Sequence, residues 1–348
     1  MSGDRRRKVL HIHLRRQEGG AERFFVNLAT ALHSRNVEQR FVVRHGLRWH
    51  ESLERVGQVV LCKYRHKPVF GLLLNYQLRR MVARWQPDAI MAWMAKSAPL
   101  IPNMSGPVKL VRLGDFPKDL SLVQNCDLLV SNTPGIGECC RALGWDRPVY
   151  TISNFPRDLD CHPIARSALD TPEDAFVISG AGRFVPHKKF DLLIRAADRV
   201  PGAYLWLVGD GKERLALEAL AREEGIWERC RFVGWVDDTG PYIAASDAFA
   251  MPSRREPLGN VVLEAWALGT PTVATRSEGP SWYMTDGENG CLVDINDLDG
   301  FTAALKRIRD DRAFAEALVA GAHAQLQAMF TRESIVDQYL QLFDGAWH

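Results

Sequence analysis

The chain has 348 residues, of which 46% are hydrophobic and 25% charged, and its formal net charge is +2. This composition excludes a disordered chain, and no apolar run approaches the roughly 18 residues of a membrane span. The N-terminus lacks the apolar core of a signal peptide. Seven scattered cysteines without a CxxC pair are typical of a reduced cytoplasmic protein.

Short apolar runs alternate with amphipathic stretches along the chain. In the first half we expect strands at 8–14, 40–43, 59–61, 88–93, 108–113, 126–131 and 149–153, and helices at 20–34, 70–85 and 134–143. A Pro- and Asp-rich segment, 154–175, is typical of a linker. In the second half we expect strands at 176–183, 203–211, 230–236, 247–253, 270–275 and 290–294, and helices at 189–200, 212–225, 260–268, 297–309, 312–328 and 332–345.

This alternation predicts an α/β protein with two doubly wound parallel sheets in tandem. Open α/β sheets bind ligands at the carboxyl ends of their strands, so we expect function in the strand-to-helix loops.

The charge is unevenly divided. Residues 1–160 carry 25 Lys and Arg against 14 Asp and Glu, a net charge of +11, whereas residues 161–348 carry −9. A basic half favours a polyanion or an anionic membrane surface as partner. The alternative is drift in surface composition.

Two strand-to-helix loops carry an anion-binding pattern. In "RRQEGGAERFF", Gly19 and Gly20 precede a predicted helix, where backbone N–H groups can approach a ligand closely. In "GAGRFVPHKKFDLLIRA", Arg183 and Lys188 follow a strand and suit a diphosphate. A plain turn and a solvated loop are the respective alternatives.

A third loop holds two carboxylates. In "PSRREPLGNVVLEAWALGTPTVAT", Glu256 precedes a helix that begins near Gly259 and Asn260, and Glu264 lies about one turn inside it. Carboxylates accept hydrogen bonds from sugar or ribose hydroxyls through both oxygens. The spacing therefore fits one ligand bridged by both carboxylates, and the alternative is two unconnected surface glutamates.

The motifs "EGGAERFFVNLATAL", "GAGRFVPHKKFDLLI", "LVGDG", "FVGWV", "MPSRREPLGNVVLEAWALGTPTVAT" and "TDGENGCLV" resemble, in this order, retaining glycosyltransferases of the GT4 type. The resemblance implies the GT-B fold, with two Rossmann-like domains facing a cleft. Residues 1–160, with a C-terminal helix at 330–348 crossing back, would form the acceptor-binding domain. Residues 161–329 would bind a nucleotide-sugar donor.

The resemblance also implies roles for single residues. Arg183 and Lys188 would hold the donor diphosphate and, with Glu256 at the transferred sugar, act in catalysis. Glu264 would bind the ribose. The remaining donor contacts would be the amides of Leu258, Gly259 and Asn260, backbone near Val236 at the base, and Gly19 and Gly20 at the diphosphate.

The chain departs from the family pattern at two positions. No histidine follows "VKLVRL", so Lys96, Arg112 and Asp115 are the acceptor-side candidates, and Trp282 replaces a frequent glutamate. The family usually works without a metal, so we expect neither a metal nor another cofactor. The two DLD triplets, 158–160 and 297–299, are interpreted as structural.

"DAIMAWMAKSAP", "VRLGDF", "NCDLLVSNTPGI" and "VYTISNFP" are similar to glycosyltransferases that build lipopolysaccharide core. The resulting hypothesis is a retaining glycosyltransferase that moves a hexose from a UDP- or GDP-sugar to a lipopolysaccharide-core or related anionic glycolipid. It would be cytoplasmic, with peripheral contact to the inner membrane, and we expect no nucleic acid partner. The alternatives are a soluble sugar-phosphate or small acceptor and a non-catalytic nucleotide-sugar-binding protein. A dehydrogenase is disfavoured because "EGGAE" is not GxGxxG.

Overall fold

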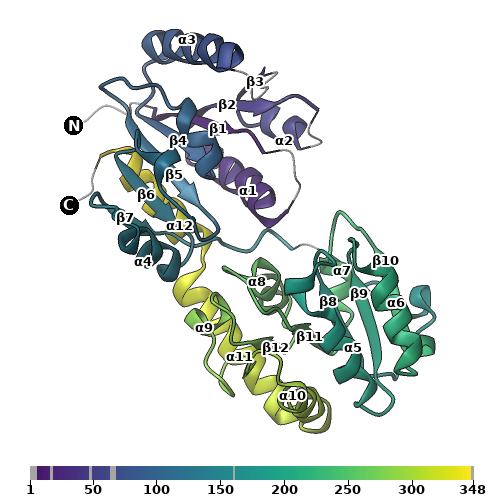
Figure 1. The fold of residues 1–348 in the computed structure, drawn as a ribbon. Coiled ribbons are helices and arrows are strands. Elements are labelled where there is room, and N and C mark those ends of the chain that lie inside the picture. The colour runs from purple at the N-terminus through teal and green to yellow at the C-terminus, as the bar shows by residue number, and fades with distance from the viewer. Residues whose placement is uncertain (1–5, 16–18, 47–48, 63–67, 160, 346–348) are drawn as a thin grey trace. The chain divides into compact units, whose positions relative to one another are not determined.

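A computed structural model, drawn in Figure 1, describes residues 6–15, 19–46, 49–62, 68–159 and 161–345. The chain divides into two compact units, one of Met1–Phe155 with Arg332–His348 and the other of Pro156–Thr331. It therefore passes between the units at 155/156 and again at 331/332. The sequence predicted these divisions at 160/161 and 329/330. The first lies earlier because Arg157 already bonds to Asp238 of the second unit.

The first unit is built on a seven-stranded parallel sheet in the order β3-β2-β1-β4-β5-β6-β7. Its strands are β1 (Lys8–His13), β2 (Glu38–Arg44), β3 (Gln58–Cys62), β4 (Ala89–Trp93), β5 (Val108–Leu113), β6 (Leu128–Ser131) and β7 (Val149–Thr151). Its helices are α1 (Gly20–Ser34), α2 (His50–Glu54), α3 (Pro68–Trp85), α4 (Pro134–Ala142) and α12 (Arg332–Phe343), with short 3-10 turns η1 (Ala95–Leu100) and η2 (Ser121–Val123).

Successive strand residues of this sheet enter two different cores, because side chains alternate across a strand. Val9, Met91 and Leu110 pack with α1 and α12. Their neighbours Leu10, Ile90 and Val111 pack with α3 and α4. In Figure 1, α12 (yellow) accordingly lies among the strands and helices of the chain's first half. The predicted return of the last helix is confirmed.

The second unit has a six-stranded parallel sheet in the order β10-β9-β8-β11-β12-β13. Its strands are β8 (Val177–Ala181), β9 (Tyr204–Val208), β10 (Cys230–Gly234), β11 (Ala248–Met251), β12 (Thr272–Thr275) and β13 (Cys291–Val293). Its α-helices are α5 (Phe190–Asp198), α6 (Arg214–Glu223), α7 (Gly240–Ala244), α8 (Asn260–Ala267), α9 (Pro280–Tyr283), α10 (Leu298–Asp310) and α11 (Arg312–Met329), and η3 (Arg166–Leu169), η4 (Pro186–Lys188) and η5 (Trp227–Arg229) are 3-10 turns.

The two faces of this second sheet are also covered by different helices. α5, α6 and α10 pack on one face, and α8, α9 and the later part of α11 pack on the other. The prediction of two doubly wound units is confirmed. Sequence reasoning missed the short helices α2, α7 and α9, because one turn of helix is too short to show a period of 3.6 residues.

One buried cation fastens α12 to the first unit. Arg112, on β5, is 1% exposed. Its Nε donates to the Tyr339 hydroxyl on α12 at 3.1 Å, and its Nη2 donates to the Asn154 side-chain oxygen. The guanidinium lies over the rings of Phe24 and Trp93, 4.7 and 5.4 Å from their centroids. Arg112 therefore joins three segments that are far apart in the sequence.

We expect Arg112→Met to lower the unfolding free energy of the first unit by about 3 kcal/mol. The substitution removes the hydrogen bonds that Arg112 donates to the buried Asn154 and Tyr339 groups, and it removes the stacked cation. The matched control is Arg35→Met. It breaks an exposed ion pair, 2.5 Å long, between Arg35 after α1 and Asp337 on α12. It should cost at most about 1 kcal/mol. Calorimetry of the full chain measures both unfolding free energies. Equal losses of stability in the two variants would contradict the role of Arg112 in holding α12 to the first unit.

Candidate functional site

Both sheets contain a point where the strand order reverses, and open α/β sheets bind ligands outside the carboxyl ends of the strands there. In the first unit this point lies between β1 and β4, and in the second between β8 and β11. The loop after β8 carries Arg183 and Lys188, and the loop after β11 carries Glu256 and Gly259. Most of the predicted donor residues of the second unit thus lie at its reversal point, whereas Val236 follows the edge strand β10.

Close backbone packing holds the loop after β8. A Cβ on Gly209, which follows β9, would lie 1.9 Å from the Gly182 carbonyl oxygen. A Cβ on Gly211 would lie 2.4 Å from the Phe184 carbonyl oxygen. The two glycines of the Gly-Asp-Gly segment, residues 209–211, are therefore needed for packing, because their lack of a side chain lets the two loops touch. This contact fixes the backbone on either side of Arg183.

The loops after β8 and β11 are joined directly. The Arg254 N–H donates to the His187 carbonyl oxygen at 2.8 Å, and the Lys188 ammonium forms an ion pair with a Glu256 carboxylate oxygen. Their side chains are 18% and 14% exposed, so both charges remain within reach of solvent. The structure thus brings together two predicted residues that are 68 positions apart.

The surroundings of this pair are electropositive. Burial lowers the pKa of His187 below its ordinary value, and the cations Lys188, Arg255 and Arg183 lower it further, while Glu256 acts in the opposite direction. Arg183 is exposed, and within the described part of the chain its side chain makes no ion pair. A cation with a free guanidinium beside a second cation suits an anionic ligand such as a diphosphate.

The turn into α8 presents two backbone amides. Gly259 has a φ of 87°, a conformation that favours glycine. The buried Tyr283 donates its hydroxyl to the Leu258 carbonyl at 2.9 Å, and burial followed by the nearby Glu256 charge raises its pKa. In the described part of the chain neither the Leu258 nor the Gly259 N–H donates a hydrogen bond. Asn260 is the first residue of α8. The turn is therefore fixed while these donors stay available.

Glu264, on α8, is only 6% exposed. One carboxylate oxygen accepts from the Thr239 hydroxyl at 3.0 Å, and the other lies 3.5 Å from Nε of Arg157. Val236, predicted near the base, is half-buried against the core that also contains α8. Sequence reasoning missed Arg157, Asp238, Thr239 and Tyr283. The only signals were an arginine in a presumed linker and the acidic "DDTG" turn.

The remaining predicted donor residues belong to the first unit. Gly19 precedes α1 with an extended φ of −179°, and Gly20 begins the helix. Among the described residues, a Cβ on Gly19 would meet only a Glu22 carboxylate oxygen, at 3.4 Å. Since neither backbone angle nor space requires glycine at position 19, the fold alone does not explain it.

The three acceptor-side candidates differ in exposure. Lys96, in η1, and Asp115, after β5, are exposed, and Asp115 accepts from the Phe116 N–H at 2.9 Å. Arg112 is buried and donates to Tyr339 and Asn154, so in this conformation its guanidinium is a structural group rather than an acceptor contact.

Two other histidines do not replace the absent one after β5. His11 and His13, on β1, are both 0% exposed. Burial lowers the pKa of His11 to about 3 and, together with the Arg15 charge, that of His13 to about 4. Both are therefore neutral core groups at pH 7, and His13 stacks on Phe25 at 5.2 Å.

Comparison with known proteins supplies a family. The sequence model of the protein family described as "Glycosyl transferases group 1" matches residues 163–325. The lipopolysaccharide core biosynthesis glycosyltransferase LpsE of Rhizobium meliloti (strain 1021) is 47% identical over 96% of this chain and 98% of its own length. The chain belongs to the group 1 glycosyltransferases.

Similarity to two further proteins supports this family and the fold. The lipopolysaccharide core biosynthesis glycosyltransferase LpsD of the same organism is 45% identical over 97% of this chain and 98% of its own length. The crystal structure of Anabaena Alr3699/HepE in complex with UDP matches with a TM-score of 0.84 at 21% identity, covering 97% of this chain and all of that one. The fold is GT-B, and the chain is a glycosyltransferase.

Two features of this glycosyltransferase have structural roles. Trp282 is half-buried and packs edge-on against Phe330, with ring centroids 5.9 Å apart, against the core that also contains α8. Asp297 caps α10 by accepting from the Gly300 N–H at 2.9 Å, and Asp299 pairs with Arg199. Of the other DLD triplet, Asp160 lies outside the described residues. Among those described, no three His, Cys, Asp or Glu side chains gather closely enough to hold a metal ion.

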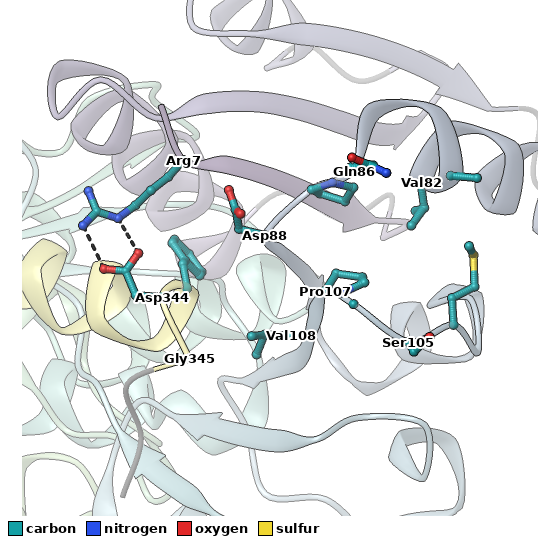
Figure 2. A pocket seen from close by; sticks show the side chains of 14 residues that line it. Arg7, Val82, Gln86, Asp88, Ser105, Pro107, Val108, Asp344 and Gly345 are labelled. Carbon is teal, nitrogen blue, oxygen red and sulfur yellow. Dashed lines mark hydrogen bonds and ion pairs between the residues drawn. The ribbon is translucent and has the colours of Figure 1, made fainter. Parts of the chain in front are cut away.

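A pocket of about 950 Å³ lies at the amino ends of strands in the glycosyltransferase's first sheet. It is lined by residues that precede β1, β4 and β5, among them Arg7, Asp88 and Pro107, and by Asp344 after α12. Figure 2 shows Arg7 and Asp344 joined by two hydrogen bonds, 2.6 and 2.8 Å long. Asp88 accepts from the Lys8 N–H at 2.8 Å. These charged side chains of the pocket therefore bond to other parts of the first unit. The pocket lies at the amino ends of the strands, whereas a donor is expected at carboxyl ends.

We expect Gly209→Ala to destabilise the second unit by at least about 2 kcal/mol, because the added Cβ cannot lie 1.9 Å from the Gly182 carbonyl. The control is Gly202→Ala, which also has a positive φ (+72°) but open space around its Cβ. That substitution should cost about 1 kcal/mol from backbone strain alone. Equal shifts in thermal unfolding of the two variants would contradict the loop-packing argument.

Proposed function

We propose that this glycosyltransferase moves a hexose from a UDP- or GDP-sugar, with retention of configuration, to a lipopolysaccharide-core or related glycolipid acceptor. The observation that carries the acceptor class is the 47% identity, over nearly the whole of both chains, to a lipopolysaccharide core biosynthesis glycosyltransferase. The donor class rests on the site at the reversal point of the second sheet.

Each group of that site has a task in the proposed reaction. Arg183 and Lys188 would hold the diphosphate and stabilise its charge as the sugar leaves, which is the usual role of cations at a departing phosphate. The amides of Leu258, Gly259 and Asn260 would meet the sugar and the distal phosphate, and Val236 would lie at the base. Gly19 and Gly20 would approach the diphosphate from the first unit.

Retention needs no separate strong base in this scheme. In a front-face reaction, the donor's own phosphate oxygen takes the proton of the acceptor hydroxyl as the new bond forms. The Lys188–Glu256 pair would then place one cation at the phosphate and one carboxylate at the hydroxyls of the sugar. The missing histidine after β5 is compatible with such a mechanism. No metal or other cofactor enters it.

For the acceptor, we propose peripheral contact with an anionic cytoplasmic membrane surface. No described helix has both the length and the apolar composition to cross a bilayer. On α3, Arg79, Arg80 and Arg84 are exposed beside Tyr76, which is 58% exposed. Such residues suit anionic headgroups. The scattered cysteines, none of them in a CxxC pair, support a reducing compartment.

The donor and acceptor classes are tested in two steps. A thermal-shift panel of nucleotides and nucleotide sugars should raise the melting temperature for one base and one sugar, because a ligand of the folded state stabilises it. The selected labelled donor is then offered to truncated lipopolysaccharide cores and to soluble sugar phosphates. Transfer to soluble acceptors alone would refute the glycolipid acceptor. Donor binding without transfer or hydrolysis would favour a non-catalytic protein.

We expect the two glutamates to respond differently to substitution. Glu264→Ala should abolish donor binding because it removes the carboxylate assigned to the ribose. Glu256→Ala should lower kcat by a factor of about 100 while changing nucleotide affinity less than tenfold, since it is assigned to the sugar. Calorimetric titration with the bare nucleotide and steady-state kinetics measure the two effects. Equal nucleotide affinities in wild type and both variants would refute the assignment.

A further inference from the structure

A polar network connects the start of the second unit to Glu264. Arg157, the second residue after the first crossing between the units, donates through Nη2 to Asp238 and lies within 3.4 Å of the Thr239 hydroxyl oxygen. Thr239 in turn donates to Glu264 at 3.0 Å. The Asp238 carboxylate also accepts from the Gly240 N–H at 2.6 Å, at the start of α7. The Arg157 guanidinium is thus bonded to the turn at Asp238 and Thr239, beside the Glu264 carboxylate.

The Arg157 side chain has one buried donor that makes no hydrogen bond within the described residues, and this donor lies beside that carboxylate. Its Nε is buried and makes no hydrogen bond within the described part of the chain, although it lies 3.5 Å from a Glu264 oxygen. The guanidinium supplies the only positive charge paired with this carboxylate among the described residues. A carboxylate that is 6% exposed needs such a charge, because burial without one is unfavourable.

We propose that Arg157 is a positioning residue that fixes the Glu264 carboxylate to accept hydrogen bonds from the two ribose hydroxyls of the donor nucleotide. This proposal rests on the donor site proposed above. The two carboxylate oxygens offer about four lone-pair positions. Thr239 and Arg157 engage one oxygen each and leave positions on both for a vicinal diol. Arg157 therefore determines how well the site distinguishes a ribose from a sugar without these hydroxyls.

A second arginine of the same segment shows what a purely structural role looks like. Arg166 has the same side-chain exposure as Arg157, 17%, and also pairs with an aspartate, Asp247, at 2.9 Å. Its Nε and Nη1 donate to the carbonyls of Ala245 and Ala175, at 3.2 and 2.7 Å. All its nitrogens are used by the fold, and none lies beside a predicted ligand-binding group.

The test compares Arg157→Gln with Arg166→Gln in the full chain. Each variant is titrated with UDP or GDP, whichever the wild type binds, and with the 2′,3′-dideoxy form of that nucleotide. We expect the wild type to prefer the ribonucleotide by a factor of about ten or more. Arg157→Gln should lose most of this preference while binding the dideoxy form almost as well as wild type. Arg166→Gln should lower the melting temperature and keep the preference.

Two additional variants sharpen the result. Arg157→Lys keeps the charge but not the planar fork, so it should fold and retain only part of the preference, which also covers the case in which Arg157→Gln does not fold. In a double-mutant cycle, Glu264→Gln and Arg157→Gln should be strongly non-additive toward the ribonucleotide.

The outcomes separate this proposal from the proposed function. If the wild type binds no nucleotide, the donor site fails and this proposal fails with it. If the wild type discriminates between the two nucleotides and Arg157→Gln and Arg157→Lys keep the same ratio, the donor site stands and the role of Arg157 is overturned.

Discussion

The burial of one guanidinium organises the first unit. Arg112 is held by Asn154, the second-last residue of that unit before the first crossing, and by Tyr339 on the helix that follows the second crossing. Phe155 packs edge-on against Phe24, which also lies under the Arg112 guanidinium, and Arg332 lies over the Phe155 ring at 5.6 Å. A buried cation is tolerated only when its partners are all in place. Both crossing segments are therefore secured at one point of the first unit.

The second unit positions its functional groups by a different means, the close approach of backbone to backbone. Gly209 and Gly211 let the loop after β9 touch the loop that carries Arg183, and Gly279 would place a Cβ only 2.3 Å from the Leu258 carbonyl. These contacts leave the loops little freedom, and the Lys188–Glu256 ion pair then joins them. A site for a charged ligand is best supported by such rigid elements, because less has to be ordered when the ligand binds.

The sequence predicted the long periodic elements and the two-unit fold, because strand and helix periods are local properties. It also selected Lys188 and Glu256, but not their direct contact, since no local pattern shows which of two loops 68 positions apart meet. Arg112 is one of three acceptor-side candidates in the sequence, and its burial cannot be read from "VKLVRL" because its partners lie 42 and 227 positions away. Arg157 was overlooked for a related reason, because a Pro- and Asp-rich segment is typical of a linker whether or not its side chains are buried.

The return of α12 also determines the order in which the protein can be completed on the ribosome. The second unit, Pro156–Thr331, is continuous, so all of its core is present before the last residues emerge. The core shared by α1 and the first sheet, in contrast, includes Ile335, Tyr339 and Phe343, which are made only after the whole second unit. Domains usually mature in the order of synthesis. Here the half of the molecule that is translated first is the half that finishes last, and until then the face of its sheet that α12 covers stays open to chaperones and proteases.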